Sequence, residues 1–270
     1  MYKLIKKIML GLGLLLVMFS LTACRNHDPK TVRIGIMSGD EAVWKPIVKH
    51  LAKEGITLKL ILFTDYNQPN GALQYHELEM NSFQHSYFLN QWNQAHHTHL
   101  QSLGVTYLAP SRLYSNKIKK VSQLKPHDQI VIPNDATNEG RALSLLQSAK
   151  LITLKTNRAL PTTKDIQTNP LKLRITPLDS AQTPRSLKDA QAAIVPNDMA
   201  ASAKLKLSTA IYTEKINQTS KPYVNILVAN DKNNPVYQKV VAAYQTETNK
   251  KNIQKIYHGT AVAAWDQTFK

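Results

Sequence analysis

Phe83, Gln84 and His85 bring an aromatic ring, an amide and an imidazole together at the end of an apolar, strand-like run over residues 78–83. A ring packs against apolar ligand groups, whereas the amide and the imidazole donate and accept hydrogen bonds. At the rim of a sheet, such a triplet is suited to ligand binding. The structural alternative is a phenylalanine that fills the core beside a histidine on the surface.

Further short polar motifs occur next to apolar runs and help to separate these two interpretations. They are Asp65-Tyr66 with Pro69-Asn70, Pro133-Asn134-Asp135-Ala136-Thr137-Asn138 with Gly140-Arg141, Pro184-Arg185-Ser186-Leu187, and Pro222-Tyr223-Val224-Asn225. In order and separation, the set resembles the NlpA lipoprotein family, the methionine-binding lipoproteins of bacterial ABC importers. The resemblance covers nearly all of the chain after Cys24 and favours the binding interpretation of the triplet.

The periodicity of the N-terminal part of the body predicts α/β structure. Residues 31–37 alternate as in a β-strand, apolar residues from Val43 to Leu51 recur at helical spacing, and residues 57–63 form a second strand-like run. A strand–helix–strand order is typical of a parallel sheet covered by helices. The pattern alone therefore predicts an α/β fold, and the length favours two compact units.

The resemblance makes this architecture more specific. It implies the two-lobed type II periplasmic-binding-protein fold, in which the chain passes twice between the lobes and ligand binds in the cleft between them. We expect one interlobe crossing near residues 109–114 and the other near residues 222–225. Lobe 1 would then comprise residues 31–110 and 224–270, and lobe 2 residues 111–223. A cleft of this kind lies at the carboxyl ends of the strands.

A free amino acid presents a carboxylate, which calls for a guanidinium group or the N–H groups of a helix start. Arg141 lies close to Asn138 in the first turn of a helix that we predict to begin near Gly140, so both devices can converge. A surface arginine at a helix start is the alternative. The resemblance implies that Arg141 binds the carboxylate and that Asn225 and Asn197 bind the amino acid moiety. The Pro-Asn-Asp sequence around Asn197 departs from the family, which usually has further Asn or Thr there.

The thioether of methionine needs an apolar slot with aromatic edges, where contacts between sulfur and a ring contribute about 0.3–1.5 kcal/mol. The resemblance implies that Tyr66, Phe83 and Phe88 build this wall and that His85 is the histidine of the cleft. Core packing is the alternative for each of them. Tyr87 and Phe88 stand where the family usually has Pro and Tyr, so the helix start can shift and one hydroxyl is missing.

The sequence gives less support to metal binding or catalysis than to the binding of an amino acid. His96, His97 and His99 lie near the end of a helix predicted over residues 85–100, but a zinc site would need further His or acidic partners at suitable spacing. We expect a solvated helix end there. The chain shows no Ser-His-Asp order, no pair of carboxylates in a plausible site and no phosphate-binding loop. We therefore expect a protein that is not an enzyme and that needs no metal or other cofactor.

The N-terminal residues are typical of a bacterial lipoprotein signal. Three lysines precede an apolar run over residues 8–19, which is too short to span a bilayer and has the length of a secretory h-region. A lipobox, Leu-Thr-Ala-Cys, ends at Cys24, the only cysteine of the chain. We expect residues 1–23 to be a signal peptide and residues 24–30 a tether lipidated at Cys24. An ordinary secreted protein with a stray cysteine is the alternative.

The chain is strongly basic, with a net charge of +16 that becomes +13 when the three leader lysines are removed. Attraction to an anionic membrane face or wall polymers is the functional interpretation of this charge, but the lysines are dispersed along the chain, which favours a solvated basic surface. No nucleic-acid recognition motif accompanies the charge. We expect a lipid-anchored protein on the extracytoplasmic face of the cell membrane that captures methionine and delivers it to an ABC permease with ATPase subunits. The alternatives are the same scaffold with a Met-containing dipeptide, another apolar amino acid or a metal ion, and a surface adhesin that uses the basic face.

Overall fold

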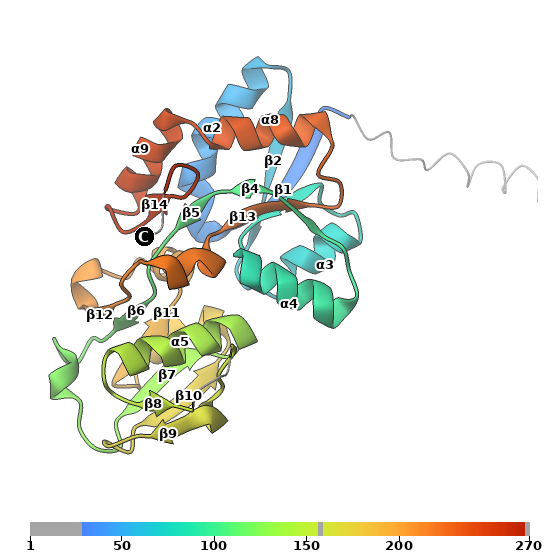
Figure 1. Cartoon of the computed structure of the whole chain (residues 1–270). Helices are drawn as coiled ribbons and strands as arrows, with labels where there is room; N and C mark the ends of the chain where they lie inside the picture. Colours follow the sequence, from blue (N-terminus) through green and yellow to red (C-terminus); the bar gives the residue numbers. More distant parts are fainter. Residues whose placement is uncertain (1–28, 156–158, 268–270) are drawn as a thin grey trace, which may run out of the picture. The chain divides into compact units, whose positions relative to one another are not determined.

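The computed structural model describes residues 29–155 and 159–267. The predicted signal peptide, the lipobox and most of the tether lie outside the described residues. From Val32 onward the chain belongs to one compact unit, and most of its helices and strands are labelled in Figure 1. In the described ranges, no helix is both long enough and apolar enough to cross a membrane.

The first lobe is built on a sheet with the strand order β2-β1-β3-β13-β4. Its strands are β1 (Thr31–Met37), β2 (Thr57–Phe63), β3 (Met80–Ser82), β4 (Gln101–Val105) and β13 (Ile226–Ala229). Its helices are α2 (Glu41–Lys53), α3 (Pro69–Gln74), α4 (Ser86–His96), α8 (Pro235–Tyr244) and α9 (Glu247–Ile256). β1 and β3 are parallel, but β13 is antiparallel to both β3 and β4. The expectation of a parallel sheet is therefore wrong for this half of the sheet, because β13 enters from the second lobe and runs against β3.

Helix α2 covers the sheet of the first lobe with the apolar residues that its periodicity predicts. Val43, Trp44 and Leu51 are fully buried, and the ring of Trp44 packs 4.9 Å from that of Tyr244 in α8. Burial of one such side chain contributes about 1.5–3 kcal/mol. The helix ends before Gly55, which takes a left-handed conformation with φ of 74°. Figure 1 shows α2 and α8 side by side at this sheet.

The second lobe is built on a sheet with the strand order β10-β7-β11-β6-β12. Its strands are β6 (Arg112–Tyr114), β7 (Gln129–Pro133), β10 (Arg174–Leu178), β11 (Ala192–Val195) and β12 (Ala210–Thr213), and a small antiparallel pair is formed by β8 (Thr153–Leu154) and β9 (Ile166–Thr168). Its helices are α5 (Ala136–Ser148), α6 (Thr183–Ser186) and α7 (Asn197–Ser202). β7 is parallel to β10 and β11, whereas β6 is antiparallel to β11 and β12. The carboxyl ends of β7 and β11 lead directly into α5 and α7.

Two segments connect the lobes, as the sequence predicts. One runs from β5 (Tyr107–Leu108), which pairs with β14 (Val262–Ala263), to β6. The other runs from β12 through the 3-10 helix η6 (Gln218–Tyr223) to β13. The two segments are hydrogen-bonded to each other, because the N–H of Thr106 donates to the carbonyl of Asn225 at 2.7 Å and the N–H of Asn225 donates to the carbonyl of Tyr107 at 2.9 Å. The two-lobed fold with two crossings is therefore confirmed, while the exact lobe boundaries stay a prediction.

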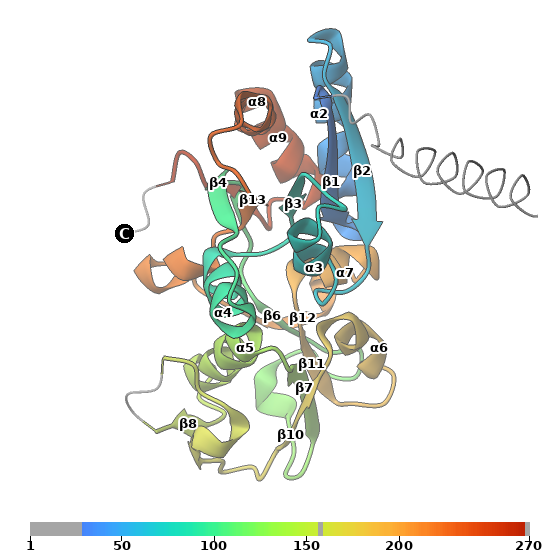
Figure 2. The ribbon, with the colours of Figure 1, turned by 90° about the vertical axis from the view of Figure 1, so that its right-hand side faces the viewer.

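The lobes also touch away from the crossings. The hydroxyls of Ser38 and Ser202 are 3.2 Å apart, and the 3-10 helix η1 (Ser38–Asp40) approaches α7 so closely that a Cβ atom on Gly39 would lie 2.5 Å from the carbonyl oxygen of Asp198. Only glycine fits at this position while the lobes are in contact. Figure 2 shows a second place of contact, where α4 of the first lobe lies beside α5 of the second.

Helix α4 is shorter than predicted. It ends at His96 because His97 takes a left-handed conformation with φ of 52°, and β4 begins four residues later. The prediction of a helix up to residue 100 is therefore wrong. His96, His97 and His99 are all exposed, and the ring of His96 stacks on Trp92 with the centroids 3.7 Å apart. Within the described residues, no group of three or more His, Cys, Asp or Glu side chains is placed to hold a metal ion.

Candidate ligand-binding site

A cavity lies between the two lobes, at the carboxyl ends of β3, β7 and β11, and both crossings border it. All eight residues that the sequence predicts to bind ligand line this cavity. They are Tyr66, Phe83, His85, Phe88, Asn138, Arg141, Asn197 and Asn225. The centres of water-sized molecules can occupy about 50 Å³ of it, and one water needs about 10–15 Å³ on this measure. The space therefore suits a small molecule.

Three aromatic side chains form a wall of the cavity. The ring centroids of Tyr66, Phe83 and Phe88 lie 5.7–6.1 Å apart, and both pairs that include Phe88 meet edge to face. These separations are in the favourable range for aromatic pairs. Tyr87 does not replace the hydroxyl that Phe88 lacks, because its own hydroxyl donates to the carbonyl of Ala159 at 3.3 Å. The wall that the sequence predicts is thus assembled, and it is apolar at Phe88.

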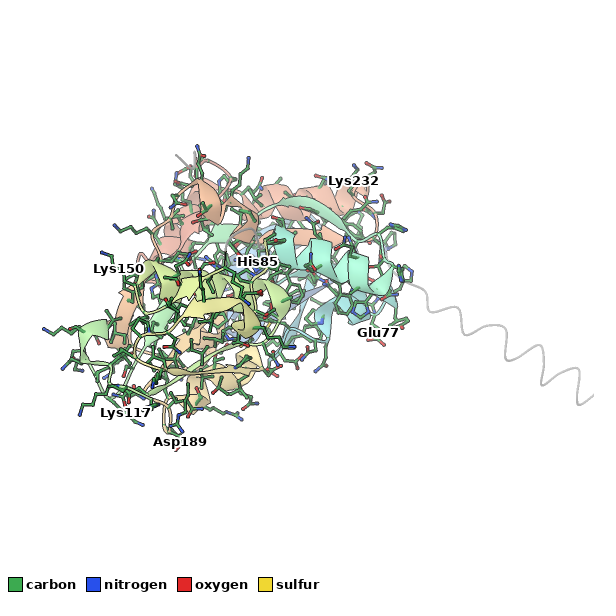
Figure 3. All side chains as sticks on the ribbon, turned by 60° about the horizontal axis from the view of Figure 1, so that its bottom comes forward. Glu77, His85, Lys117, Lys150, Asp189 and Lys232 are labelled. Carbon is green, nitrogen blue, oxygen red and sulfur yellow. The ribbon has the colours of Figure 1, made fainter. Side chains whose placement is uncertain are left out.

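His85 caps the start of α4 and faces the second lobe. Its Nδ1 accepts a hydrogen bond from the N–H of Phe88 at 3.1 Å, so the ring proton is on Nε2, which lies 3.4 Å from Oδ1 of Asn138. Burial, and after it the nearby Arg141 cation, together lower the pKa of His85 to about 3. His85 is buried, and Figure 3 shows it in the middle of the molecule in that view, while most of the labelled lysine and acidic side chains lie toward the edges. At neutral pH, His85 is therefore an uncharged hydrogen-bond donor.

The start of α5 is set by Asp135, whose carboxylate accepts hydrogen bonds from the backbone N–H and from the side-chain amide of Asn138, each at 3.0 Å. An aspartate at this position satisfies an N–H group that the helix itself leaves unpaired. The helix begins at Ala136, so the predicted start near Gly140 is wrong and Arg141 lies in the second turn. Binding of an anion at this place would therefore depend on the guanidinium group of Arg141 and not on the helix start.

Arg141 is held in a network that crosses from α5 to both interlobe segments. Its Nε and Nη2 donate to the two carboxylate oxygens of Glu214 at 3.2 and 2.6 Å, and Nη2 also donates to the carbonyl of Ala109 at 3.0 Å. The guanidinium carbon lies 4.4 Å from the ring centroid of Tyr223, a cation–π contact. Nη1 forms no hydrogen bond with the described residues and remains for an anionic ligand group. Sequence reasoning missed Glu214, which is 73 residues from Arg141.

Asn225 and Asn197 present amide groups to the cavity from two different elements. The backbone of Asn225 pairs with the first crossing and also forms a β-bridge with His85, so its position is fixed. Oδ1 of Asn197 accepts from Nη1 of the buried Arg112 at 3.3 Å, whereas its Nδ2 is buried without a hydrogen-bond partner among the described residues. Buried polar groups normally have a partner. Nδ2 of Asn197 is therefore a donor that a ligand can use.

Asp198, which the sequence prediction did not include, lies next to Asn197 in the wall of the same cavity. The hydroxyl of Tyr66 donates to its Oδ1 at 2.6 Å, across the interlobe boundary. Burial raises the pKa of Asp198. A second buried acid, Asp40, has its pKa raised by burial and then by the negative charge of Asp198. The only signal for Asp198 in the sequence is its place directly after an apolar strand, at a point where the chain departs from the family.

Comparison with known proteins shows the family to which the chain belongs. The NlpA lipoprotein family model matches residues 32–265. Lipoprotein 28 of Escherichia coli (strain K12) is 39% identical over 94% of this chain and 96% of its own length. A probable D-methionine-binding lipoprotein MetQ of Vibrio cholerae is 39% identical over 88% of this chain and 90% of its own.

Solved structures of similar sequence share the two-lobed fold. The substrate-binding protein of a methionine transporter from Streptococcus pneumoniae has a TM-score of 0.83 and 40% identity, covering 87% of this chain and 96% of that one. A nutrient-binding protein from Burkholderia cenocepacia, solved with bound methionine, has a TM-score of 0.82 and 38% identity, covering 86% and 99%. On these matches, and as the motifs around Phe83, Arg141 and Asn225 imply, the chain belongs to the NlpA lipoprotein family.

Proposed function

We propose that this protein is a lipid-anchored, extracytoplasmic receptor that captures methionine between its two lobes and delivers it to an ABC permease with ATPase subunits. The observation that carries the proposal is the interlobe cavity, where an aromatic wall and a guanidinium group with a free nitrogen line one small space. The relatives named for D-methionine binding and the neighbour solved with methionine support this choice of ligand. A receptor of this kind releases its ligand unchanged and performs no catalysis.

The two ends of methionine have different partners in this proposal. The carboxylate receives hydrogen bonds from Nη1 of Arg141 and from the amides of Asn197 and Asn225, and the thioether lies against the rings of Phe83 and Phe88. A hydrogen bond to a charged group contributes about 1.5–3 kcal/mol, and a contact between sulfur and a ring about 0.3–1.5 kcal/mol. The polar groups would fix the orientation of the ligand, while the rings would select an unbranched apolar side chain.

The anchor and the division into lobes belong to the same proposal. Residues 1–23 act as the signal peptide, and residues 24–30 form a tether that carries lipid on Cys24. Lobe 1 comprises residues 31–110 and 224–270, lobe 2 comprises residues 111–223, and the lobes separate to admit the ligand. The hydrogen-bonded crossings at Thr106 and Asn225 support a hinge at that place, since both segments would have to bend together.

A thermal-shift panel on the protein without its signal peptide tests the ligand. At a methionine concentration 100 times the dissociation constant, binding stabilises the folded state by about 2.7 kcal/mol, which raises the melting temperature by about 5–10 °C for a chain of this size. The panel includes both stereoisomers of methionine, leucine, a Gly-Met dipeptide and divalent metal ions. A shift with another of these solutes, but with neither methionine, identifies a different ligand, and no shift with any solute favours the adhesin alternative.

A matched pair of variants shows where the ligand binds. Asn225→Ala removes an amide that lines the cavity, and Asn233→Ala removes an exposed amide that does not line it. We expect Asn225→Ala to bind methionine at least tenfold more weakly and Asn233→Ala to bind as wild type does, both measured by calorimetry. Equal affinities for the two variants would place the methionine site outside this cavity.

A further inference from the structure

The carboxylate of Asp198 is buried, and only one of its two oxygens has a hydrogen-bond partner among the described residues. The residue is 7% exposed. Its Oδ1 accepts the hydroxyl of Tyr66, but its Oδ2 is buried without a hydrogen-bond partner among the described residues. Asp40, the neighbouring buried acid, differs in this respect, because it accepts hydrogen bonds from the hydroxyls of both Tyr107 and Tyr257. Of the two acids, only Asp198 lines the cavity.

Among the residues that the structure describes, no cationic side chain accounts for the free oxygen. The ionisable groups that act on Asp198 are acidic or phenolic, namely Tyr66, Tyr107, Asp40 and Asp135. The two cations of this region, the buried Arg112 and the partly buried Arg141, have other partners. Arg141 is paired with Glu214, and Arg112 donates to the carbonyls of Pro110 and Thr260 and to the amide of Asn197. An ionised carboxylate that is buried without a counter-charge is costly, and a cation supplied by the ligand would relieve this cost.

The cavity therefore offers complementary groups for the two charges of a free amino acid. Nη1 of Arg141 and Nδ2 of Asn197 are free donors for an anion, whereas Oδ2 of Asp198 is a free acceptor. An ammonium group carries three N–H donors and no acceptor, and its bond to a carboxylate is charge-assisted. We propose that Oδ2 of Asp198 accepts the ammonium group of the ligand and thereby restricts the site to ligands with a free amino group. This inference rests on the proposed function, since it assumes that an amino acid is the ligand.

Methionine and methylsulfanylbutanoate, which is methionine without its amino group, form the decisive ligand pair. Calorimetry compares their affinities for wild type, for Asp198→Asn and for Asp231→Asn. Asp198→Asn removes the charge but keeps an oxygen for the hydroxyl of Tyr66, and Asp231→Asn removes an exposed carboxylate as a control. We expect wild type and Asp231→Asn to prefer methionine by at least tenfold. In Asp198→Asn, methionine should bind about tenfold to a hundredfold more weakly, the factor for one charge-assisted hydrogen bond, with little change for the analogue.

The outcomes separate this inference from the proposed function. If wild type binds neither methionine nor the analogue, the proposed function fails. If wild type binds methionine but binds the analogue equally well, or if Asp198→Asn keeps the full preference for methionine, the role of Asp198 is refuted while the proposed function stands. An equal loss of affinity for both ligands in Asp198→Asn would also refute it, because a merely structural role predicts that result. The wild-type comparison by itself can refute the inference even if the variant does not fold.

Discussion

Replacement of Arg141 by alanine should impair both methionine binding and folding, for reasons that can be separated. Loss of the charged hydrogen bond to the ligand carboxylate costs about 1.5–3 kcal/mol, or about tenfold to a hundredfold in affinity. The variant also leaves the carboxylate of Glu214, whose side chain is 18% exposed, without its counter-ion. Removal of one partner from a buried pair costs about 3–5 kcal/mol. Because this pair keeps some exposure, we expect about 2–3 kcal/mol and a fall in melting temperature of about 5–10 °C.

A double-mutant cycle with Glu214→Gln tests this reasoning. In Arg141→Ala/Glu214→Gln no unpaired charge remains, and the glutamine oxygen can still accept the N–H of Ser111, which Glu214 accepts at 2.7 Å in the wild type. Urea denaturation should therefore show that the double variant is more stable than Arg141→Ala alone. Calorimetry should show that it binds methionine as weakly as Arg141→Ala does. If the double variant regains wild-type affinity, Arg141 acts only through the structure and does not contact the carboxylate.

Three further predictions concern the anchor, the aromatic wall and the buried histidine. Wild-type protein should partition into the detergent phase with lipid on Cys24, whereas Cys24→Ser should stay uncleaved or be released; an unmodified Cys24 in the intact mass of the wild type at the cell surface would contradict lipidation. Phe88→Tyr adds one neutral hydrogen-bonding group to the wall and should change the affinity for methionine, leucine or Gly-Met by about twofold to twelvefold; three unchanged affinities mean that position 88 does not face the ligand. Burial lowers the pKa of His85 from 6.5 to about 3. Between these two pH values the unfolded chain binds a proton at His85 that the folded protein does not bind. The contribution of the neutral His85 to the stability of the fold is therefore present above pH 6.5 and is lost as the pH falls toward 3. Thermal unfolding of His85→Asn should therefore depend less steeply on pH in this window, and an unchanged slope would argue against a buried neutral imidazole.

The sequence by itself determined several of the local elements. Alternating apolar residues predict β1 and β2, helical spacing predicts α2, and Gly55 marks the end of that helix. These features depend on side-chain patterns within a few residues, which is why they can be inferred without the fold. The resemblance to a family supplied the two crossings and eight of the residues that line the cavity, from Tyr66 to Asn225, but not Asp198.

The tertiary structure decided which groups are paired and which remain free. Arg141 meets Glu214 across 73 residues, and Tyr66 meets Asp198 across 132, and no periodicity links positions so far apart. The capping bond to Asp135 places the start of α5 at Ala136, before the predicted start near Gly140. The sheet of the first lobe is mixed because β13 returns from the second lobe and runs antiparallel to β3. Hydrogen bonds and burial of this kind are fixed only when separate segments pack together. Only the tertiary structure therefore shows that Asp198 is buried with one oxygen unpartnered among the described residues, whereas the sequence shows only an acidic residue after an apolar strand.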